Sequence, residues 1–520
     1  MNRFAAPNLS RRHLLIGAAA ALGAHGRVLA QPRFDRNPFG LGIASGEPTP
    51  DGFVIWTRVL ADPSSAPPAF DDAYLLVYQV AEDPDFRRVV RSAEILALPQ
   101  DAHSVHVELR GLQPARDYWY RFALHPGHLS PVGRARTTPA PGARLDRLDL
   151  VVASCQHYET GLYGAWRDAI RDQGRRPDAI LFLGDYIYEG STTGALPRHH
   201  NVRQKPITLG DYRRRYALYK SDPDLQAAHA AAPWLPIWDD HEVENDYAGD
   251  QSQDLKEPAT FLAIRAAAYR AWWEHMPVRP SAKPNGPNAA IYRRVRFGDL
   301  VRIDLLDSRQ YRSPQPCPRP GRGGDNLVGP DCTERLDTGL SMLGAAQEKW
   351  LFDGLRDGGA RWNLIGNQSL MAPFDYQLGP GELRRTDLWD GYPAARARLL
   401  AAFRDSRLAN PVVLTGDLHA HVVADLADAS GRTIASEFVG TSISSATTPR
   451  EDAWVNARLA ENRHIKLIHN RHRGYLAVSM TRDRLLADLR IVEDVTDRMT
   501  PARTFKRFAV AAGKPGAVPD

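Results

Sequence analysis

The chain has 520 residues, of which 43% are hydrophobic and 24% charged, as in a soluble globular protein long enough for two or three domains. The formal net charge is +5, but Arg3, Arg11, Arg12 and Arg27 supply four of these charges before residue 31. The rest of the chain is therefore close to neutral at +1, which argues against a nucleic-acid partner.

Residues 1–30 have the pattern of a twin-arginine signal peptide. Arg11 and Arg12 precede the apolar stretch Leu14–Ala24, and small residues offer a cleavage site before Gln31. This stretch is too short to span a bilayer, and no second long apolar stretch follows it. The sequence predicts export by the twin-arginine translocation machinery to the periplasm or the medium, with no membrane anchor.

Residues 31–141 are predicted to form a small β-sandwich domain. Short strands with turns between them are expected at Phe53–Val59, Tyr74–Val80, Ser104–Leu109 and Tyr118–Ala123. Ionisable residues do not cluster here as they would at a catalytic site, so we expect an accessory domain that shapes or shields the active-site cleft. A linker rich in Pro and Gly spans residues 138–146.

Residues 142–520 are predicted to form a layered α/β domain, because strands alternate with helical segments. The expected helices are Thr260–Met276, Ala345–Leu355 and Pro393–Arg404. The expected strands include Leu300–Leu306, Arg361–Ile365, Leu476–Met480 and Leu485–Ile491, and a polar tail follows them. The polar segment 191–260 is expected to supply loops and helices over the active-site face.

Two apolar strands of this domain each end in Gly-Asp. The side chains that follow the strand ends are Asp185 and Tyr188 in one case, and Asp417 and His419 in the other. A single Gly-Asp is as often a simple turn. Two copies at the carboxyl ends of buried strands, where open α/β sheets place their chemistry, indicate a metal centre built from separate loops.

Three more strand ends carry candidate ligands. The sets are Cys155; Asp239, Asp240, His241 and Asn245; and Asn367 and Gln368. Cys155 is either an inert buried thiol or a thiolate ligand, and its strand-end position favours the ligand. The two remaining cysteines, Cys317 and Cys332, flank a loop rich in Pro and Gly and are predicted to form a disulfide in an oxidising compartment.

The candidate ligands divide by chemical hardness into two sets. Cys155, Tyr188, His419 and Asp185 suit a transition metal, most plausibly Fe³⁺, which thiolate and phenolate stabilise. The oxygen-only set suits Ca²⁺ or Mg²⁺ and consists of Asp185, Asp240, Asn245, Asp417 and either Asn367 or Gln368. Asp185 would then bridge the two metal sites. The sequence leaves open whether Asp239 or Asp240 is the ligand.

These motifs resemble those of PhoD-type alkaline phosphatases/phosphodiesterases, within the calcineurin-like and purple acid phosphatase superfamily. The matching segments are Gly42–Gly52, Ser154-Cys155, Gly184–Glu189, Trp238–Asn245 and Gly416–His419. The resemblance implies a four-layered α/β/β/α sandwich core behind a β-rich N-terminal domain, with one Fe³⁺ and two Ca²⁺. Cys155 in place of an Asp, and Asp417 in place of a His, count against a plain dinuclear zinc or manganese enzyme.

The implied activity is that of a secreted phosphoester hydrolase acting on diesters and monoesters through a metal-activated hydroxide. His241 and Asp185 are the expected catalytic residues, His241 by protonating the leaving alkoxide or stabilising the phosphoryl charge. Arg471 or Arg473 could reach the substrate, although a surface arginine is the commoner case. We expect a monomer.

Three other functions compete with this one. A phospholipase-D-like activity on phospholipid head groups would use the same centre. An exported redox protein is disfavoured because the chain has no haem, iron–sulfur or dinucleotide motif, and an oxygen-rich second site is useless for electron transfer. A non-catalytic binding protein would require that Asp185→Asn leave activity intact.

Overall fold

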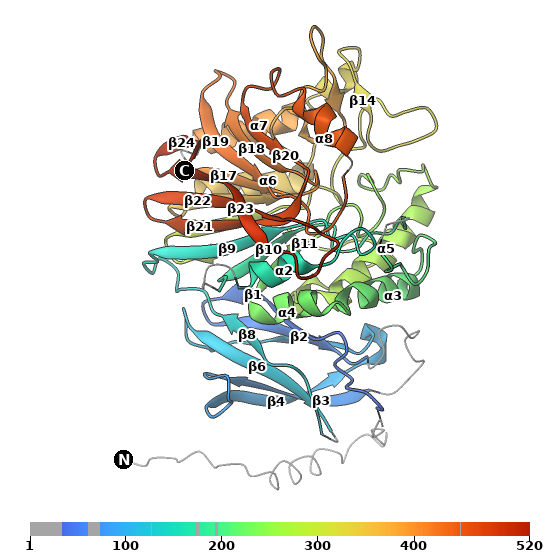
Figure 1. Ribbon diagram of the computed structural model, residues 1–520, viewed down its shortest axis with the longest axis vertical. Helices are drawn as coiled ribbons and strands as arrows, with labels where there is room; N and C mark the ends of the chain where they lie inside the picture. The colour runs from blue at the N-terminus through green and yellow to red at the C-terminus, as the bar shows by residue number, and fades with distance from the viewer. Residues whose placement is uncertain are drawn as a thin grey trace.

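The computed structural model describes residues 34–60, 73–125, 127–171, 176–192, 196–406, 408–447 and 449–520. The predicted signal peptide lies outside these residues. Two large sheets form the core, with strand orders β24-β23-β22-β21-β9-β10-β11-β1-β2-β5 and β12-β13-β15-β17-β19-β18-β20 (Figure 1).

The first sheet has a parallel centre formed by β9, β10 and β11. Its strands are β1 (Ile43–Thr49), β2 (Gly52–Arg58), β5 (Ser104–Glu108), β9 (Arg147–Ala153), β10 (Ala179–Leu183), β11 (Trp234–Ile237), β21 (Arg473–Thr481), β22 (Arg484–Val492), β23 (Ala502–Ala511) and β24 (Lys514–Pro519).

The second sheet is parallel through β13, β15, β17 and β19. Its strands are β12 (Arg293–Phe297), β13 (Val301–Leu305), β15 (Trp362–Asn367), β17 (Pro411–Thr415), β18 (His421–Ala427), β19 (Thr433–Val439) and β20 (Ile465–His469). The strands predicted at Leu300–Leu306, Arg361–Ile365, Leu476–Met480 and Leu485–Ile491 are confirmed, with bounds that differ by a few residues.

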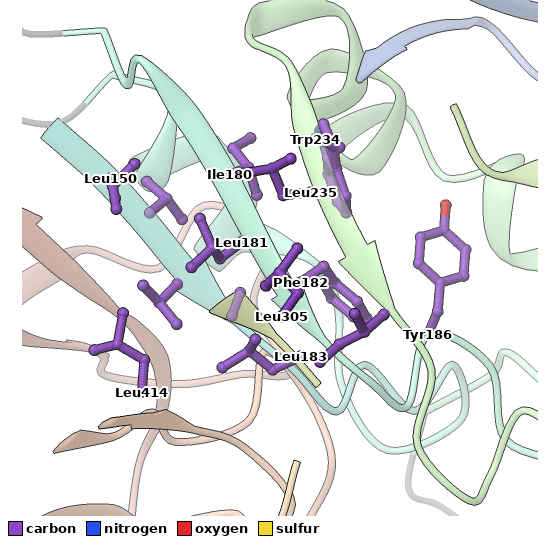
Figure 2. Close-up of a cluster of buried hydrophobic side chains, with 14 of the residues drawn as sticks. Leu150, Ile180, Leu181, Phe182, Leu183, Tyr186, Trp234, Leu235, Leu305 and Leu414 are labelled. Atoms are coloured by element: carbon purple, nitrogen blue, oxygen red, sulfur yellow. The ribbon is translucent and has the colours of Figure 1, made fainter. Parts of the chain in front are cut away.

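The alternation of side chains along the buried strands produces four layers. On β17, Val412 and Leu414 belong to the core shared with the first sheet, whereas Val413 belongs to the core beneath α6 and α7. Figure 2 shows Leu181 and Leu183 of β10 in the interior that also holds Leu305 and Leu414.

Helices cover the outer face of each sheet. Beside the first sheet lie α2 (Gly164–Ala169), α3 (Leu209–Lys220), α4 (Pro223–Ala231) and α5 (Pro258–His275), and with the second sheet pack α6 (Gly344–Arg356), α7 (Pro393–Asp405) and α8 (Pro449–Asn456) (Figure 1). The three predicted helices correspond to α5, α6 and α7 and are confirmed. The α/β fold class, with a distinct β-rich N-terminal region, is therefore confirmed as well.

The N-terminal region is a sandwich of two sheets, one of which is formed by strands of the first core sheet. A separate sheet consists of β3 (Tyr74–Ala81), β4 (Val89–Ala97), β6 (Asp117–Leu124), β7 (His128–Leu129) and β8 (Gly133–Arg136). Its apolar face packs on β1, β2 and β5. Because β1 pairs in parallel with β11, at Gly46 and Trp234, these three strands extend the first core sheet.

The prediction of a polar tail after Ile491 is wrong, because β23 and β24 continue the first sheet to its edge. Polar residues fill the exposed positions of β23, such as Arg503 and Lys506, while Phe508 and Val510 are buried. Minor elements are β14 (Leu327–Val328), β16 (Arg384–Arg385), η1 (Pro99–Asp101), η3 (Pro280–Ala282), η4 (Thr333–Leu336) and η5 (Trp389–Gly391). Among the described residues, every helix is too short or too polar to cross a membrane.

Candidate metal centre

The carboxyl ends of strands from both sheets meet at one place. After β9 and β10 the chain continues as two hydrogen-bonded loops, since Cys155 N–H donates to Gly184 O over 3.1 Å. The second Gly-Asp lies against them: a Cβ on Gly416 would stand 2.7 Å from Ser154 Oγ, and one on Gly184 would stand 2.4 Å from Asp239 Cβ. Each glycine of the two Gly-Asp pairs is therefore required for the loops to approach.

Four of the predicted ligands have left-handed backbone conformations. The φ angles are 59° at Cys155, 60° at Asp185, 64° at Asp417 and 52° at His419. Residues with a Cβ rarely adopt this region, which is uncommon enough to merit a functional explanation. The strained turns aim side chains from different strands at a common point.

The atoms predicted to bind iron lie together. One ligand atom each from Cys155, Asp185 and His419 lies within 4.8 Å of the others. The Tyr188 hydroxyl donates to Asp185 Oδ2 over 2.9 Å and is 3.0 Å from His419 Nε2. A thiol, a phenol, an imidazole and a carboxylate thus surround one position, and this donor set suits Fe³⁺.

The electrostatics of this position fit a bound cation. Asp185 Oδ1 is buried without a hydrogen-bond partner, although a carboxylate oxygen ordinarily finds one. Burial raises the pKa of Asp185 and of the Cys155 thiol well above their ordinary values, and neighbouring carboxylates add to both shifts. A metal ion would favour the deprotonated forms of these groups.

The neighbouring oxygen-rich part of the centre contains Asp240. One of its carboxylate oxygens, one from Asp185 and a ring nitrogen of His241 lie within 4.8 Å of one another. The Asp240 carboxylate also accepts hydrogen bonds from the backbone N–H groups of His241 and Asp246. Asp239 instead binds Arg309 through Oδ1 and keeps Oδ2 buried without a partner. The pKa of Asp417 is raised by burial and by the charge of Asp239.

Gln368 and Asn367 differ in whether their side-chain amide oxygen has a hydrogen-bond partner. The Gln368 amide nitrogen donates to Trp238 O and Leu306 O, so its Oε1 is fixed, buried and without a partner. In contrast, Asn367 Oδ1 accepts from Trp389 Nε1 over 3.3 Å and its amide donates to Ser369 O. Gln368 is the better candidate of the two for a metal or substrate contact.

Arg473 is buried under the site and holds its loops. Its guanidinium donates to the backbone oxygens of His419 and Ser445, as well as to Ser442 Oγ. These contacts fix the backbone that carries His419. The backbone N–H of Asn245 donates to Glu189 Oε1 over 3.2 Å, so Asn245 lies beside the centre.

His241 is paired with the buried Glu189, a residue outside the predicted set of site residues. His241 Nδ1 donates to Glu189 Oε2 over 2.7 Å. Burial opposes the charge on His241, but the carboxylates of Glu189, Asp185 and Asp240 outweigh it and raise the pKa of the imidazole. Burial opposes the charge on Glu189 as well, but the charge and hydrogen bond of His241, together with the Asn245 N–H and Lys205, lower the pKa of Glu189. Glu189 thus orients a cationic imidazole at the edge of the centre.

Two further residues were missed. Glu242 accepts hydrogen bonds from the backbone N–H groups of Asp185, Tyr186 and Asp239, which joins the loops after β10 and β11. Arg309 follows β13 and is fully buried among carboxylates. The signal that could have revealed Arg309 was present, because Leu300–Leu306 is an apolar strand followed by Asp307-Ser308-Arg309. A disulfide joins Cys317 and Cys332, and Cys155 is a free, buried thiol.

Comparisons with known proteins agree on one family. Residues 150–489 match the model of the PhoD-like phosphatase, and residues 24–139 match that of the PhoD-like phosphatase, N-terminal domain. The chain is 40% identical to alkaline phosphatase D of Bacillus subtilis (strain 168) over 508 residues, which are 96% of this chain and 85% of that protein. A solved structure of PhoD superposes with a TM-score of 0.87 at 39% identity, covering 94% of this chain and 93% of the other.

Proposed function

Because the chain belongs to the PhoD-like phosphatase family and is a phosphoric ester hydrolase, we propose that it is an exported, metal-dependent enzyme that cleaves phosphodiesters and phosphomonoesters. The observation that carries this proposal is the convergence of Cys155, Asp185, Tyr188 and His419 around the unpartnered, buried Asp185 Oδ1. A bound cation would compensate the charge of these groups once they are deprotonated.

In this proposal Cys155, Asp185, Tyr188 and His419 hold one Fe³⁺. Two Ca²⁺ are held by Asp185, Asp240, Asn245 and Asp417, with Gln368 or Asn367 as a further contact and Asp239 as a ligand or an anchor for Arg309. When bound, these metals polarise the phosphoryl oxygens and lower the pKa of water. Hard oxygen ligands suit Ca²⁺, and thiolate with phenolate suits Fe³⁺.

The chain's own contribution to the chemistry is made by His241 and the groups around it. With Nδ1 bonded to Glu189 Oε2, the imidazole can only offer Nε2 to the substrate. The raised pKa keeps that nitrogen protonated near neutral pH, so His241 can donate a proton to the leaving alkoxide. Glu242 and Arg473 hold the loops that carry Asp185 and His419, so they position ligands.

The remaining parts of the proposal concern the whole chain. Residues 1–30 direct export by the twin-arginine machinery to the periplasm or beyond, residues 31–141 form the N-terminal domain, and residues 142–520 form the catalytic domain. We propose a monomer.

The test is hydrolysis of bis(p-nitrophenyl) phosphate and p-nitrophenyl phosphate by the exported protein, with Asp185→Asn beside the exposed control Asp146→Asn. We expect both substrates to be cleaved, Asp185→Asn to lose more than about a thousandfold of kcat/KM, and the control to match wild type. Cleavage of the monoester alone would refute the diesterase part. Full activity in Asp185→Asn would refute a mechanism that depends on this centre.

A further inference from the structure

His157 stands next to the centre but is not one of its predicted ligands. Its ring lies against that of Tyr188, with centroids 4.5 Å apart, and Tyr188 also contacts His241 at 4.2 Å. Two imidazoles thus flank the phenol that we assign to the metal. Only one of them, His241, has a role in the proposed mechanism.

The structure fixes the tautomer of His157. The backbone N–H of Glu159 donates to His157 Nδ1 over 3.1 Å, and a backbone amide has no other option than to donate. Nδ1 is therefore an acceptor without a proton, and the neutral ring carries its hydrogen on Nε2. His157 is thus prepared to be a hydrogen-bond donor, and it needs no change of protonation to act as one.

The backbone of His157 is held from both sides. Its N–H donates to Ser445 Oγ over 3.0 Å, and its carbonyl accepts from Ser444 Oγ over 2.9 Å. The same Ser445 hydroxyl donates to the Tyr188 oxygen over 2.8 Å. The imidazole is therefore positioned relative to the metal centre by the network that positions Tyr188.

The Nε2 atom is the part of His157 that remains available. No described residue forms a hydrogen bond with it. It is also absent from the set of solvent-inaccessible side-chain nitrogens and oxygens that lack a hydrogen-bond partner. It must therefore keep contact with solvent, although the residue as a whole is only 9% exposed. The Nε2 atom of His241 also lacks a hydrogen-bond partner and is also not fully buried, since Glu189 binds the other ring nitrogen, Nδ1.

A second metal site is the competing explanation, because His157, Glu159 and His200 have potential ligand atoms within 4.8 Å of one another. Their hydrogen bonds argue against it. The two Glu159 oxygens accept from Thr192 N–H and His200 N–H. His200 bonds through one ring nitrogen to Ser191 and through the other to Tyr219. Glu159 and His200 therefore form a hydrogen-bonded network next to His157, with their polar atoms already paired.

We propose that His157 binds a non-bridging phosphoryl oxygen of the substrate through its Nε2–H. The inference rests on the proposed function, because the phosphoryl group must occupy the centre beside Tyr188. His157 and His241 would then contact the phosphoryl group as a pair with different duties. His157 is a hydrogen-bond donor that holds an oxygen, whereas His241 faces the leaving group.

The test uses His157→Phe, which retains an aromatic ring beside Tyr188 but has no donor, and His157→Gln, whose amide nitrogen can reach the place of Nε2. The exposed His125→Phe serves as control. KM and kcat for p-nitrophenyl phosphate and the inhibition constant of inorganic phosphate are measured on metal-replete protein. Iron content and the tyrosinate–iron absorption band are recorded for each variant.

For His157→Phe we expect KM and the inhibition constant of phosphate to rise at least about tenfold, which corresponds to the loss of one hydrogen bond to a charged group. For His157→Gln both constants should stay within roughly threefold of wild type, because its amide can still donate the hydrogen bond. Iron and the absorption band should be unchanged in both.

Several results would overturn the inference. Unchanged constants in His157→Phe would show that Nε2–H does not contact the phosphoryl group. Equal losses in both variants would show that a donor at the place of Nε2 is not what matters, and loss of iron would assign the effect to support of the centre. A wild-type enzyme that cleaves neither ester would overturn the proposed function itself.

Discussion

Replacement of Arg309 by methionine tests how the buried carboxylates around the centre are stabilised. Arg309 is fully buried, binds Asp239 through Nε, and places Nη1 2.8 Å from Asp387 and Nη2 3.5 Å from Asp240. Methionine fills a similar volume without a charge. The three carboxylates would then lose a cation that they share.

The expected loss of stability is large. Removing one partner of a buried ion pair costs about 3–5 kcal/mol, because the other charge remains buried without compensation. With an unfolding entropy of about 2.1 cal/mol/K per residue, a loss of about 4 kcal/mol in 520 residues lowers the unfolding temperature by roughly 4 °C. Since Arg312 also binds Asp387, at 2.7 Å, the loss should fall chiefly on Asp239 and Asp240.

The stability that Arg309→Met loses should depend on pH. In the wild type, burial favours the protonated forms of Asp240 and Asp387. Arg309, together with His241 at Asp240 and Arg312 at Asp387, nevertheless lowers both pKa values below the ordinary 3.8. Arg309 therefore contributes stability above that pH. Burial keeps the pKa of Asp239 at about 6 even with Arg309 present. In Arg309→Met these folded-state pKa values rise, so the variant loses stability as pH increases from about 4. Its deficit should be greater at pH 8 than at pH 5.

The assay is thermal unfolding of metal-replete protein at pH 5 and pH 8. Arg309→Lys keeps the charge and should lose less than Arg309→Met. Arg302→Met is the matched control, because Arg302 is equally buried but its partner Asp304 also binds Arg294. An equal deficit for Arg309→Met at both pH values, or one no larger than that of Arg302→Met, would refute charge compensation by Arg309.

Two other predictions concern pH. Glu189→Gln removes the charge that raises the pKa of His241, so the alkaline fall of kcat should move to lower pH, and an unchanged pH–rate profile would contradict the pairing. His106 has its pKa lowered to about 4 by burial, so its neutral form supports folding above pH 6.5 and that support is lost as pH falls toward 4. At about 1.4 kcal/mol per pKa unit, the wild type should lose up to roughly 3 kcal/mol over that range. His106→Gln should lose less in acid unfolding curves, and identical curves would show that His106 does not titrate there.

Local patterns were sufficient for the core of the fold. Apolar runs such as Ala179–Leu183 and Pro411–Thr415 are strands because both faces are covered, and periodic segments such as Pro258–His275 are helices. The pairing of β1 with β11 could not be predicted, since nothing in either strand specifies a partner nearly 190 residues away in sequence. The strand β23 was missed because its exposed face is mostly polar.

The candidate site was predicted where a residue type and a strand end coincide. Cys155, Asp185 and His419 meet both criteria, and the structure brings them together. Arg309 follows a predicted strand and meets the strand-end criterion, but its role depends on carboxylates from other elements. Glu189 likewise acts through His241, a partner that its own chain segment does not reveal. Of the two adjacent amides, only the three-dimensional hydrogen bonds separate Gln368 from Asn367.

The most direct test of the central claim is the metal content of the exported protein, purified without added metal or chelator, together with its visible absorption. We expect one iron and two calcium ions per chain, with a tyrosinate–iron charge-transfer band that is lost in Tyr188→Phe. Stoichiometric zinc or manganese without iron would contradict the assignment of Cys155, Tyr188 and His419. A folded protein without bound metal would contradict the metal centre altogether.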